Sequence, residues 1–236
     1  MLGLGANLAM SDRLFSLNDI SDLSLYLKNG VGVAVAQWDD SSGNANHASQ
    51  ATSGDQAELL EGGLHFELSE KDHYLLSTEI TITSEQGFTI FLVAEMESTG
   101  ANATILSKAN SQHFFEIMSG ADNLRLRLAS TNTVVQPDTS NLWLQGTKFL
   151  LTVVRESGGT GNIIIYKDGV LLSQASAGQA ANTGDGEYSI LGAGHSGSAT
   201  RRWLDGTIHE LAFYEKQLSA YELADVHSYL TDKHGL

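Results

Sequence analysis

Apolar and polar positions alternate over many short stretches of the chain, which is the two-residue period of β-strands. In LRLRLA (124–129) the three leucines point to one face and the two arginines to the other, so a half-buried strand is predicted. FTIFLVAEM (88–96) and KFLLTVVR (148–155) are apolar throughout, as expected of central strands covered on both faces. Further strands are predicted at LHFEL (64–68), HFFEIM (113–118), EYSILGAG (187–194) and RWLDGTIHELAFYE (202–215).

One hairpin is marked by its turn. NIIIYKDGVLLSQ (162–174) places Asp168 and Gly169 between two apolar runs, and an Asp-Gly pair supplies the positive φ of a tight hairpin turn. One strand on each side of this pair is therefore predicted.

The period changes to that of a helix at the C-terminal end. Ser219 and Glu222 have the spacing of a capping box, and Gly235 follows the last apolar position as a helix stop. A short amphipathic helix over 219–233, docked on the sheets, is predicted. Its apolar residues are Leu223, Val226 and Leu230, with Leu218 and Leu223 spaced for a hydrophobic staple.

Residues 1–29 differ from the remainder. LFSLNDISDLSLYL (14–27) carries apolar residues whose spacing, broken by Asn18, Asp19 and Asp22, fits neither one helix nor one strand. We interpret 1–29 as an N-terminal arm for anchoring or assembly, and 30–236 as the folded domain. A first strand preceded by a loose terminus is the alternative.

Composition narrows the class of protein. The 236 residues are 42% hydrophobic and 17% charged, with 24 glycines and one proline, which suits a globular domain of strands and turns. The formal net charge of −15 disfavours nucleic acid as a partner. Without cysteine there are no disulfides or thiolate metal sites, and the start, MLGLGANLAM, lacks the features of a signal peptide. No apolar run is long enough to span a membrane.

Several motifs occur in a recognisable order over residues 31–233. They resemble those of the laminin-G-like, concanavalin-A-like jelly-roll family. The resemblance implies an all-β, two-sheet antiparallel jelly-roll sandwich with a short C-terminal helix. In that family, loops at the sandwich edge bind glycans or proteins, sometimes with calcium, and other members are plain structural modules, so the fold alone does not decide function. The matching stretches are WDDSSGNANHASQ, GLHFE, FTIFLVAEM, ILSKANSQHFFEI, NIIIYKDGVLL and LDGTIHELAFYEKQLSAYELADVHSYL.

The Gly-rich start and the arm also resemble virion proteins of tailed phages. On this resemblance we expect a non-catalytic structural protein of a phage particle, of the capsid-decoration or fibre type, located in the virion. Its partners would be other virion proteins, or further copies reached through the arm. The alternative is a glycan-binding module of a bacterial surface or secreted protein that contacts cell-surface glycans, and a glycoside hydrolase is the third hypothesis.

The stretch WDDSSGNANHASQ (38–50) gathers acids, amides and serines behind a tryptophan. Asp39, Asp40 and Asn44 offer hard oxygen ligands, so a calcium site is one interpretation. The dense D-x-D-x-D-G pattern of a strong calcium loop is missing, and short Asp and Asn side chains also cap their own backbone. We expect a structural turn with Trp38 packed beneath it, calcium being the alternative and no other cofactor being indicated.

Catalytic acids are not indicated. Glucan hydrolases of this fold carry an E-x-D-x-(x)-E strand in which two carboxylates flank the glycosidic bond. Here the nearest match runs from Glu210 to Glu215, and Ala212 replaces the central acid. Glu95 and Glu97 share a strand face without a partner acid, so we interpret them as a solvated strand end.

The remaining candidates are basic and aromatic. Arg201, Arg202 and Trp203 adjoin just before the last strand, where an aromatic ring beside donors can stack on a sugar; alternatively Trp203 fills the core. The eight histidines show no H-E-x-x-H spacing for zinc. We expect His227 and His234, at the end of the helix, to be solvated.

Overall fold

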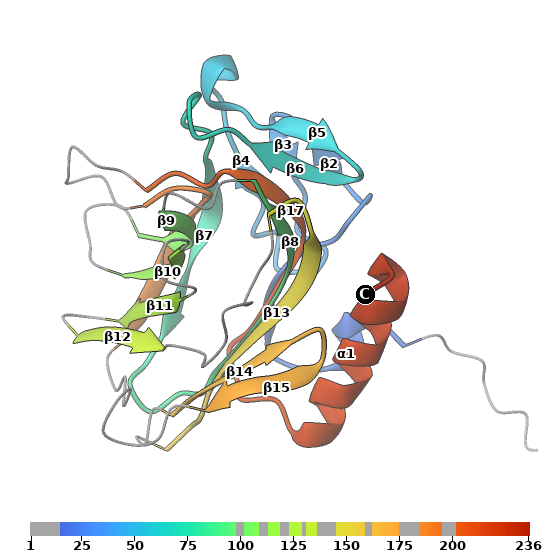
Figure 1. Cartoon of the computed structure of the whole chain (residues 1–236), viewed down its shortest axis with the longest axis vertical. Coiled ribbons are helices and arrows are strands. Elements are labelled where there is room, and N and C mark those ends of the chain that lie inside the picture. The colour runs from blue at the N-terminus through green and yellow to red at the C-terminus, as the bar shows by residue number, and fades with distance from the viewer. Residues whose placement is uncertain are drawn as a thin grey trace, which may run out of the picture.

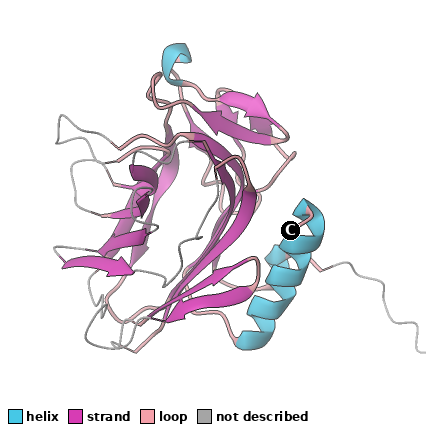
Figure 2. Ribbon diagram, viewed as in Figure 1, coloured by secondary structure: helices cyan, strands magenta, loops and turns pink. Residues whose placement is uncertain are grey.

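The chain folds into two antiparallel sheets packed face to face, with one helix on the outside (Figures 1 and 2). This is seen in a computed structural model, which describes residues 15–97, 102–108, 113–118, 123–128, 131–135, 145–158, 162–174, 185–194 and 202–236. The predicted all-β sandwich with a short C-terminal helix is confirmed.

The first sheet is eight-stranded within the described residues. Its order is β15-β14-β13-β8-β17-β6-β5, and β1 pairs with β17 beside this row. The last four residues of β17 pair with β1 and its first three with β6, so these two strands share one edge of β17. The strands are β1 (Leu23–Leu27), β5 (Glu58–Leu60), β6 (Gly63–Phe66), β8 (Phe88–Met96), β13 (Lys148–Arg155), β14 (Ile163–Lys167), β15 (Val170–Gln174) and β17 (Gly206–Tyr214).

The second sheet has nine strands within the same residues. Its order is β12-β11-β10-β9-β16-β7-β4-β3-β2. The strands are β2 (Val33–Ala34), β3 (Gln37–Trp38), β4 (Ala48–Ser49), β7 (Tyr74–Ile82), β9 (Asn102–Ser107), β10 (Phe114–Met118), β11 (Asn123–Leu128), β12 (Thr131–Val135) and β16 (Gly186–Leu191). Two 3-10 turns, η1 (Leu17–Asp19) and η2 (Ser53–Asp55), complete the described elements with the helix α1 (Ala220–His234).

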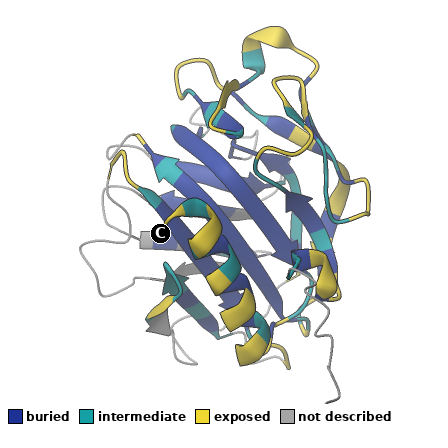
Figure 3. Cartoon of the chain, turned by 90° about the vertical axis from the view of Figure 1, so that its right-hand side faces the viewer, coloured by how far each residue is buried: buried dark blue, intermediate teal, exposed yellow. Residues whose placement is uncertain are grey.

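Two apolar clusters explain which strands are apolar on both faces. The main core lies between the sheets and takes alternate residues of each strand, such as Ile90 and Leu92 of β8. A second cluster lies on the outer face of the eight-stranded sheet, where Phe91 and Val93 of β8 meet α1 (Figure 3). The prediction that residues 88–96 form a strand buried on both faces is therefore confirmed. The second sheet covers the inner face and α1 covers the outer face.

Local sequence signals place the hairpin and the helix as predicted. Asp168 and Gly169 take φ of 50° and 76° between β14 and β15. Ser219 and Glu222 form the capping box at the start of α1, and Gly235 ends the helix in the left-handed region with φ of 70°. The buried residues Leu218, Leu223, Val226 and Leu230 pack in the outer cluster, which confirms the predicted apolar stripe.

The segment expected to be an arm lies in the sandwich as far as the structure describes it. Residues Leu23–Leu27 form β1, hydrogen-bonded to β17, and Leu17 is fully buried beneath α1. The hydroxyl of Tyr214 donates to the carbonyl of Leu17 at 2.9 Å. For residues 15–29 the expected boundary is therefore corrected, because this stretch completes the edge of β17; residues 1–14 lie outside the described part.

Among the described residues, no helix combines the length and apolar character that crossing a membrane requires.

Candidate functional site

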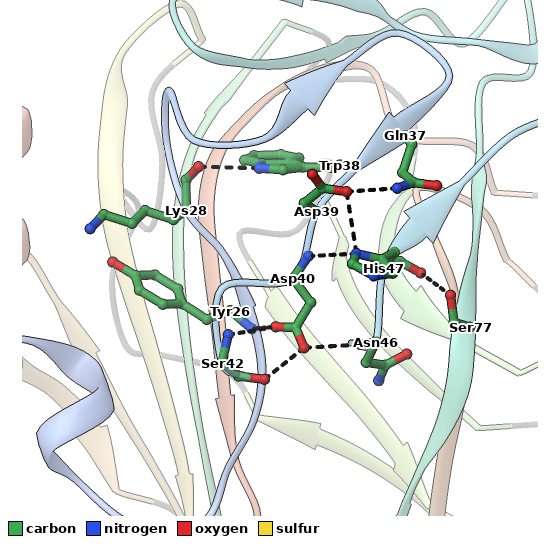
Figure 4. A network of polar contacts seen from close by, with 10 residues as sticks. All are labelled: Tyr26, Lys28, Gln37, Trp38, Asp39, Asp40, Ser42, Asn46, His47 and Ser77. Atoms are coloured by element: carbon green, nitrogen blue, oxygen red, sulfur yellow. Dashed lines mark hydrogen bonds and ion pairs between the residues drawn. The ribbon is translucent and has the colours of Figure 1, made fainter. Parts of the chain in front are cut away.

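The loop between β3 and β4 is organised by one carboxylate (Figure 4). Asp40 accepts hydrogen bonds from the backbone N–H of Tyr26 (2.9 Å), Ser42 (2.9 Å) and Asn46 (3.0 Å). Its second oxygen also accepts from the Ser42 hydroxyl at 2.6 Å. Trp38 is fully buried beneath the loop and donates from Nε1 to the carbonyl of Lys28 at 3.2 Å. The carboxylate of Asp40 therefore caps the backbone of its own loop and of β1.

The other two calcium candidates point to protein partners as well. Asp39 accepts from Nε2 of Gln37 at 2.6 Å and lies 3.3 Å from Nδ1 of His47. Asn44 donates from Nδ2 to the carbonyl of Leu23 at 2.7 Å. In the parts of the chain that the structure describes, no group of three or more His, Asp or Glu side chains is arranged to hold a metal ion. These contacts favour the structural turn.

We expect Asp40→Ala to lower the free energy of unfolding by about 3 kcal/mol, or roughly 6–12 °C in Tm, because it leaves buried donors unpaired. Asp39→Ala removes only a partly exposed contact and is expected to cost less than about 1 kcal/mol. Both changes are measured by thermal unfolding with and without a chelator, which should leave Tm unchanged. A Tm that falls with chelator and recovers with calcium, in wild type but not in Asp39→Ala, would restore the calcium interpretation.

Beside this loop lies an open groove of about 440 Å³. The end of the loop forms one wall, the start of β1 and the residue after β17 form another, and the middle of β7 forms the third. The polar lining consists of hydroxyls from Ser24 and Thr78, and of carboxylates and amides. The carboxylates are those of Asp22, Glu79 and Glu215, and the amides are those of Asn44, Asn46 and Gln86. Leu23 and Ile80 form the apolar part of the lining.

Asn46 is the most buried polar residue of the groove. It is 3% exposed, and its Oδ1 accepts from the backbone N–H of Thr78 at 2.8 Å. Its amide nitrogen Nδ2 has no hydrogen-bond partner among the described residues, although the residue lines the groove. Since Asn46 lines the groove, this nitrogen is a hydrogen-bond donor available to a ligand.

Glu215 lies at the inner end of the same groove. Burial raises the pKa of its carboxyl, and the neighbouring charge of Asp22 raises it further against hydrogen bonds from Ser24 and Gln86. Asp22 itself holds a positive φ of 64°, which Asp tolerates better than most residues. The chain thus brings two acids together by folding back at the junction of β1 and β17, where the N–H of Glu215 donates to the carbonyl of Asp22 at 2.8 Å.

The ligand-binding candidates beside β17 are engaged within the protein. Nη1 of Arg202 donates to both oxygens of the buried Glu116, at 2.7 and 2.8 Å. Trp203 is 8% exposed, packs with Ile190 and Ala193, and its ring lies 5.6 Å from that of His73. Arg201 lies outside the described residues. The surroundings of Arg202 and Trp203 are those of packing residues.

The two acids of the hydrolase-like pattern are separated by the fold. Glu215 lines the groove, whereas Glu210 is 1% exposed and accepts from Tyr26 Oη (2.6 Å), Lys233 Nζ (2.7 Å) and His234 Nε2 (2.6 Å). Burial raises the pKa of Glu210, but these three hydrogen bonds outweigh it and hold the pKa below its usual range. Glu210 is thus a buried anchor for the end of α1.

The histidines of the helix are not solvated, which corrects that expectation. His227 is 9% exposed, and its Nε2 lies 3.0 Å from Oγ1 of Thr152 on β13. The His234 side chain is 5% exposed because it contacts Glu210. Next to it, His209 is 1% exposed, lies 4.0 Å from Glu95, and has neither ring nitrogen hydrogen-bonded within the described residues.

The two-sheet sandwich with one covering helix is the fold of a concanavalin A-like domain. The sequence profile of the concanavalin A-like lectin/glucanases superfamily, of the laminin G type, matches residues 68–224. The chain belongs to this superfamily. No curated protein sequence matches it.

Solved structures with the same fold have low sequence identity to this chain. The binding domain of Paraclostridial Mosquitocidal Protein 1 superposes with a TM-score of 0.64 at 14% identity, over 91% of this chain and 53% of that one. A Trypanosoma rangeli sialidase in complex with sialic acid gives 0.60 at 14% identity, over 91% and 34%. Botulinum neurotoxin type C, which depends on two ganglioside molecules to enter cells, gives 0.57 at 16% identity, over 91% and 52%. This chain spans about half of the toxin binding domains.

Proposed function

We propose that this chain is a carbohydrate-binding module and that the groove beside the β3–β4 loop is its binding site. The observation that carries the proposal is the amide nitrogen Nδ2 of Asn46, which has no hydrogen-bond partner among the described residues, in a groove lined by carboxylates, amides and hydroxyls. Such side chains pair with sugar hydroxyls as both donors and acceptors. The groove volume of about 440 Å³ lies within the range that small-molecule sites occupy, about 300–1,000 Å³.

The similar structures support the same class of ligand. The sialidase is seen with sialic acid, and the neurotoxin interacts with gangliosides, which are sugar-bearing lipids. Their identity to this chain is too low to transfer a ligand or a site residue. They make a glycan the first class to test, on a cell surface or outside the cell.

We propose a non-catalytic role, which the way the acids of the hydrolase-like pattern are held supports. Most glycoside hydrolases place two carboxylates on either side of the glycosidic bond. Glu210 is enclosed by three hydrogen bonds beneath α1, so Glu215 has no catalytic partner from that pattern. We therefore propose binding without turnover.

The virion role expected from the sequence rested on a resemblance carried in part by an anchoring arm. The described part of that segment forms β1 and packs beneath α1, so it is not available as an extended anchor. The glycan-binding alternative has a groove with a free donor in its favour. It is the function we propose.

The proposal is tested by filling the groove. Thr78 lies on its wall and is exposed, so Thr78→Phe occupies the space while leaving the core intact. Thr81 is exposed on the same strand outside the groove, and Thr81→Phe is the matched control. Wild type and Thr81→Phe are expected to bind the same sugars on a glycan array and in calorimetry, and Thr78→Phe to lose at least about tenfold in affinity. Equal binding by the three proteins would exclude the groove, and binding to no glycan would exclude the function.

A further inference from the structure

The groove carries an unbalanced negative charge at one end. Among the described residues, no lysine, arginine or histidine nitrogen lies within 4.0 Å of the carboxylates of Asp22 or Glu215. The nearest lysine in the sequence, Lys216, pairs with Glu222 at 2.8 Å and donates at 3.1 Å to the hydroxyl of Ser21, which in turn donates to Oδ2 of Asp22 at 2.8 Å. The two acids therefore face the groove as a pair of like charges.

The third acid of the groove, Glu79, has an ion-pair partner. Lys108 lies 3.1 Å from Glu79 and also pairs with Glu187 on β16. The acids of the groove that have no ion-pair partner among the described residues thus lie at the end where β1 and β17 meet. Burial and the charge of Asp22 both disfavour the ionised form of Glu215, and a cation placed between the two acids would relieve this repulsion.

A second observation lies at the other end of the groove. Asn46 is 3% exposed as a residue and its Oδ1 is held by the N–H of Thr78, but its amide nitrogen Nδ2 has no hydrogen-bond partner among the described residues and so is available to a ligand. This donor suits a hydroxyl oxygen, whereas the acids suit a cation. A ligand that satisfies both ends carries a positive charge and hydroxyl groups on one small frame.

We propose that the groove binds amino sugars, with the ligand ammonium between Asp22 and Glu215 and a sugar hydroxyl on Nδ2 of Asn46. This rests on the proposed glycan-binding function and specifies its ligand class. The net charge of −15 acts in the same direction, since it repels sialylated and sulfated glycans and attracts cationic ones. Sialic acid, which the similar sialidase binds, is therefore expected to be rejected here.

The test compares two oligomers of the same sugar backbone, one with charged amino groups and one with neutral acetamido groups. Calorimetry is done below neutral pH with a short oligomer of glucosamine, whose amines are protonated, and with the N-acetylated oligomer of the same length. Wild type is expected to bind the cationic oligomer at least about tenfold more tightly, and to lose this preference as salt is added. Sialyllactose is expected not to bind.

The preference is assigned to the two acids by a neutral isostere at each. The double variant Asp22→Asn, Glu215→Gln is expected to bind both oligomers equally, because it keeps the hydrogen-bonding groups and removes the charges. Asn tolerates the positive φ at position 22. The matched control, Glu58→Gln with Glu70→Gln, removes two exposed acids outside the groove and should keep the wild-type preference.

The outcomes separate the ligand class from the function. Equal binding of both oligomers by wild type would overturn the amino-sugar proposal and leave glycan binding standing. Binding of neither oligomer, nor of any array glycan, would remove both. Calcium chloride alone, or a short lysine peptide, that binds wild type more tightly than the glucosamine oligomer and loses affinity in the double variant would make the groove a site for another cation and overturn the proposal.

Discussion

Deletion of residues 1–24 is expected to unfold the protein. The deletion removes three buried side chains of the cluster beneath α1, namely Leu17 (0% exposed), Ile20 (8%) and Leu23 (7%). Burying an aliphatic side chain of this size stabilises a fold by about 1.5–3 kcal/mol, so the three together supply about 5–9 kcal/mol. The whole free energy of unfolding of a domain is about 5–15 kcal/mol, so a loss of this size removes most of it.

Circular dichroism and thermal unfolding measure this result. A deletion that stops at residue 14 keeps every contact named above and is the control. Leu17→Ala tests the same cluster with one change, and the cavity beneath α1 is expected to cost about 2–5 kcal/mol. A deletion of 1–24 that stays folded, with the Tm of the control, would show that the segment is dispensable and would return it to the role of an arm.

The segment was hard to interpret from sequence for a physical reason. In LSLYL (23–27) four of the five residues are buried, because one face meets the core and the other lies beneath α1. No alternation survives in such a strand, and the preceding turn is a short 3-10 element capped by Ser16 and Asp19. The polar residues Asn18, Asp19 and Asp22 are typical of a loop. The strand is identified only by its hydrogen-bonded pairing with β17.

The interior strands and the helix were more accessible to prediction. The bounds of β8 and β13 coincide with the two continuous apolar runs, and the capping box fixed the start of α1. These features depend on residues near one another in sequence. The groove does not, because its walls come from residues near 22, 44, 78 and 215, which no local motif connects.

The buried histidines show the same limit. A β-bulge between Ile208 and Glu210 interrupts the pairing of β17 with β8, so simple alternation misplaces His209 and Glu210. His227 follows the apolar stripe of α1 by one residue and reaches Thr152 only because β13 lies under that helix turn. The sequence shows these histidines, but not the neighbours that bury them.

The protein is expected to lose stability steeply as the pH falls from about 6.5 to about 4. Burial lowers the pKa of His209 to about 4, and the charges of Lys148 and His234 act in the same direction. Burial alone lowers the pKa of His227 to about 4, where its ring lies against those of Phe91 and Tyr166. Both side chains are therefore neutral in the folded protein under conditions in which the unfolded chain already binds a proton at each.

The sign follows from this difference in protons bound. With folded pKa values below the unfolded value of 6.5, the histidines stabilise the fold fully above pH 6.5. This contribution declines as the pH falls from 6.5 to about 4. The loss is complete below the folded pKa values. One pKa unit corresponds to about 1.4 kcal/mol, so a pKa lowered from 6.5 to about 4 makes each histidine account for a loss on the order of 3 kcal/mol. The lowered pKa of Glu210 adds a further loss at still lower pH, as its carboxylate protonates.

Urea unfolding at a series of pH values between about 7 and 4 measures this dependence. The double variant His209→Gln, His227→Gln keeps polar side chains that carry no proton equilibrium in this range, so its free energy of unfolding should change much less over the same interval. His73→Gln, at a histidine that is only half-buried, is the matched control and should retain the wild-type slope. A wild-type protein equally stable at pH 7 and pH 4.5, or a double variant with the full wild-type slope, would show that the two rings do not set the acid limit of this fold.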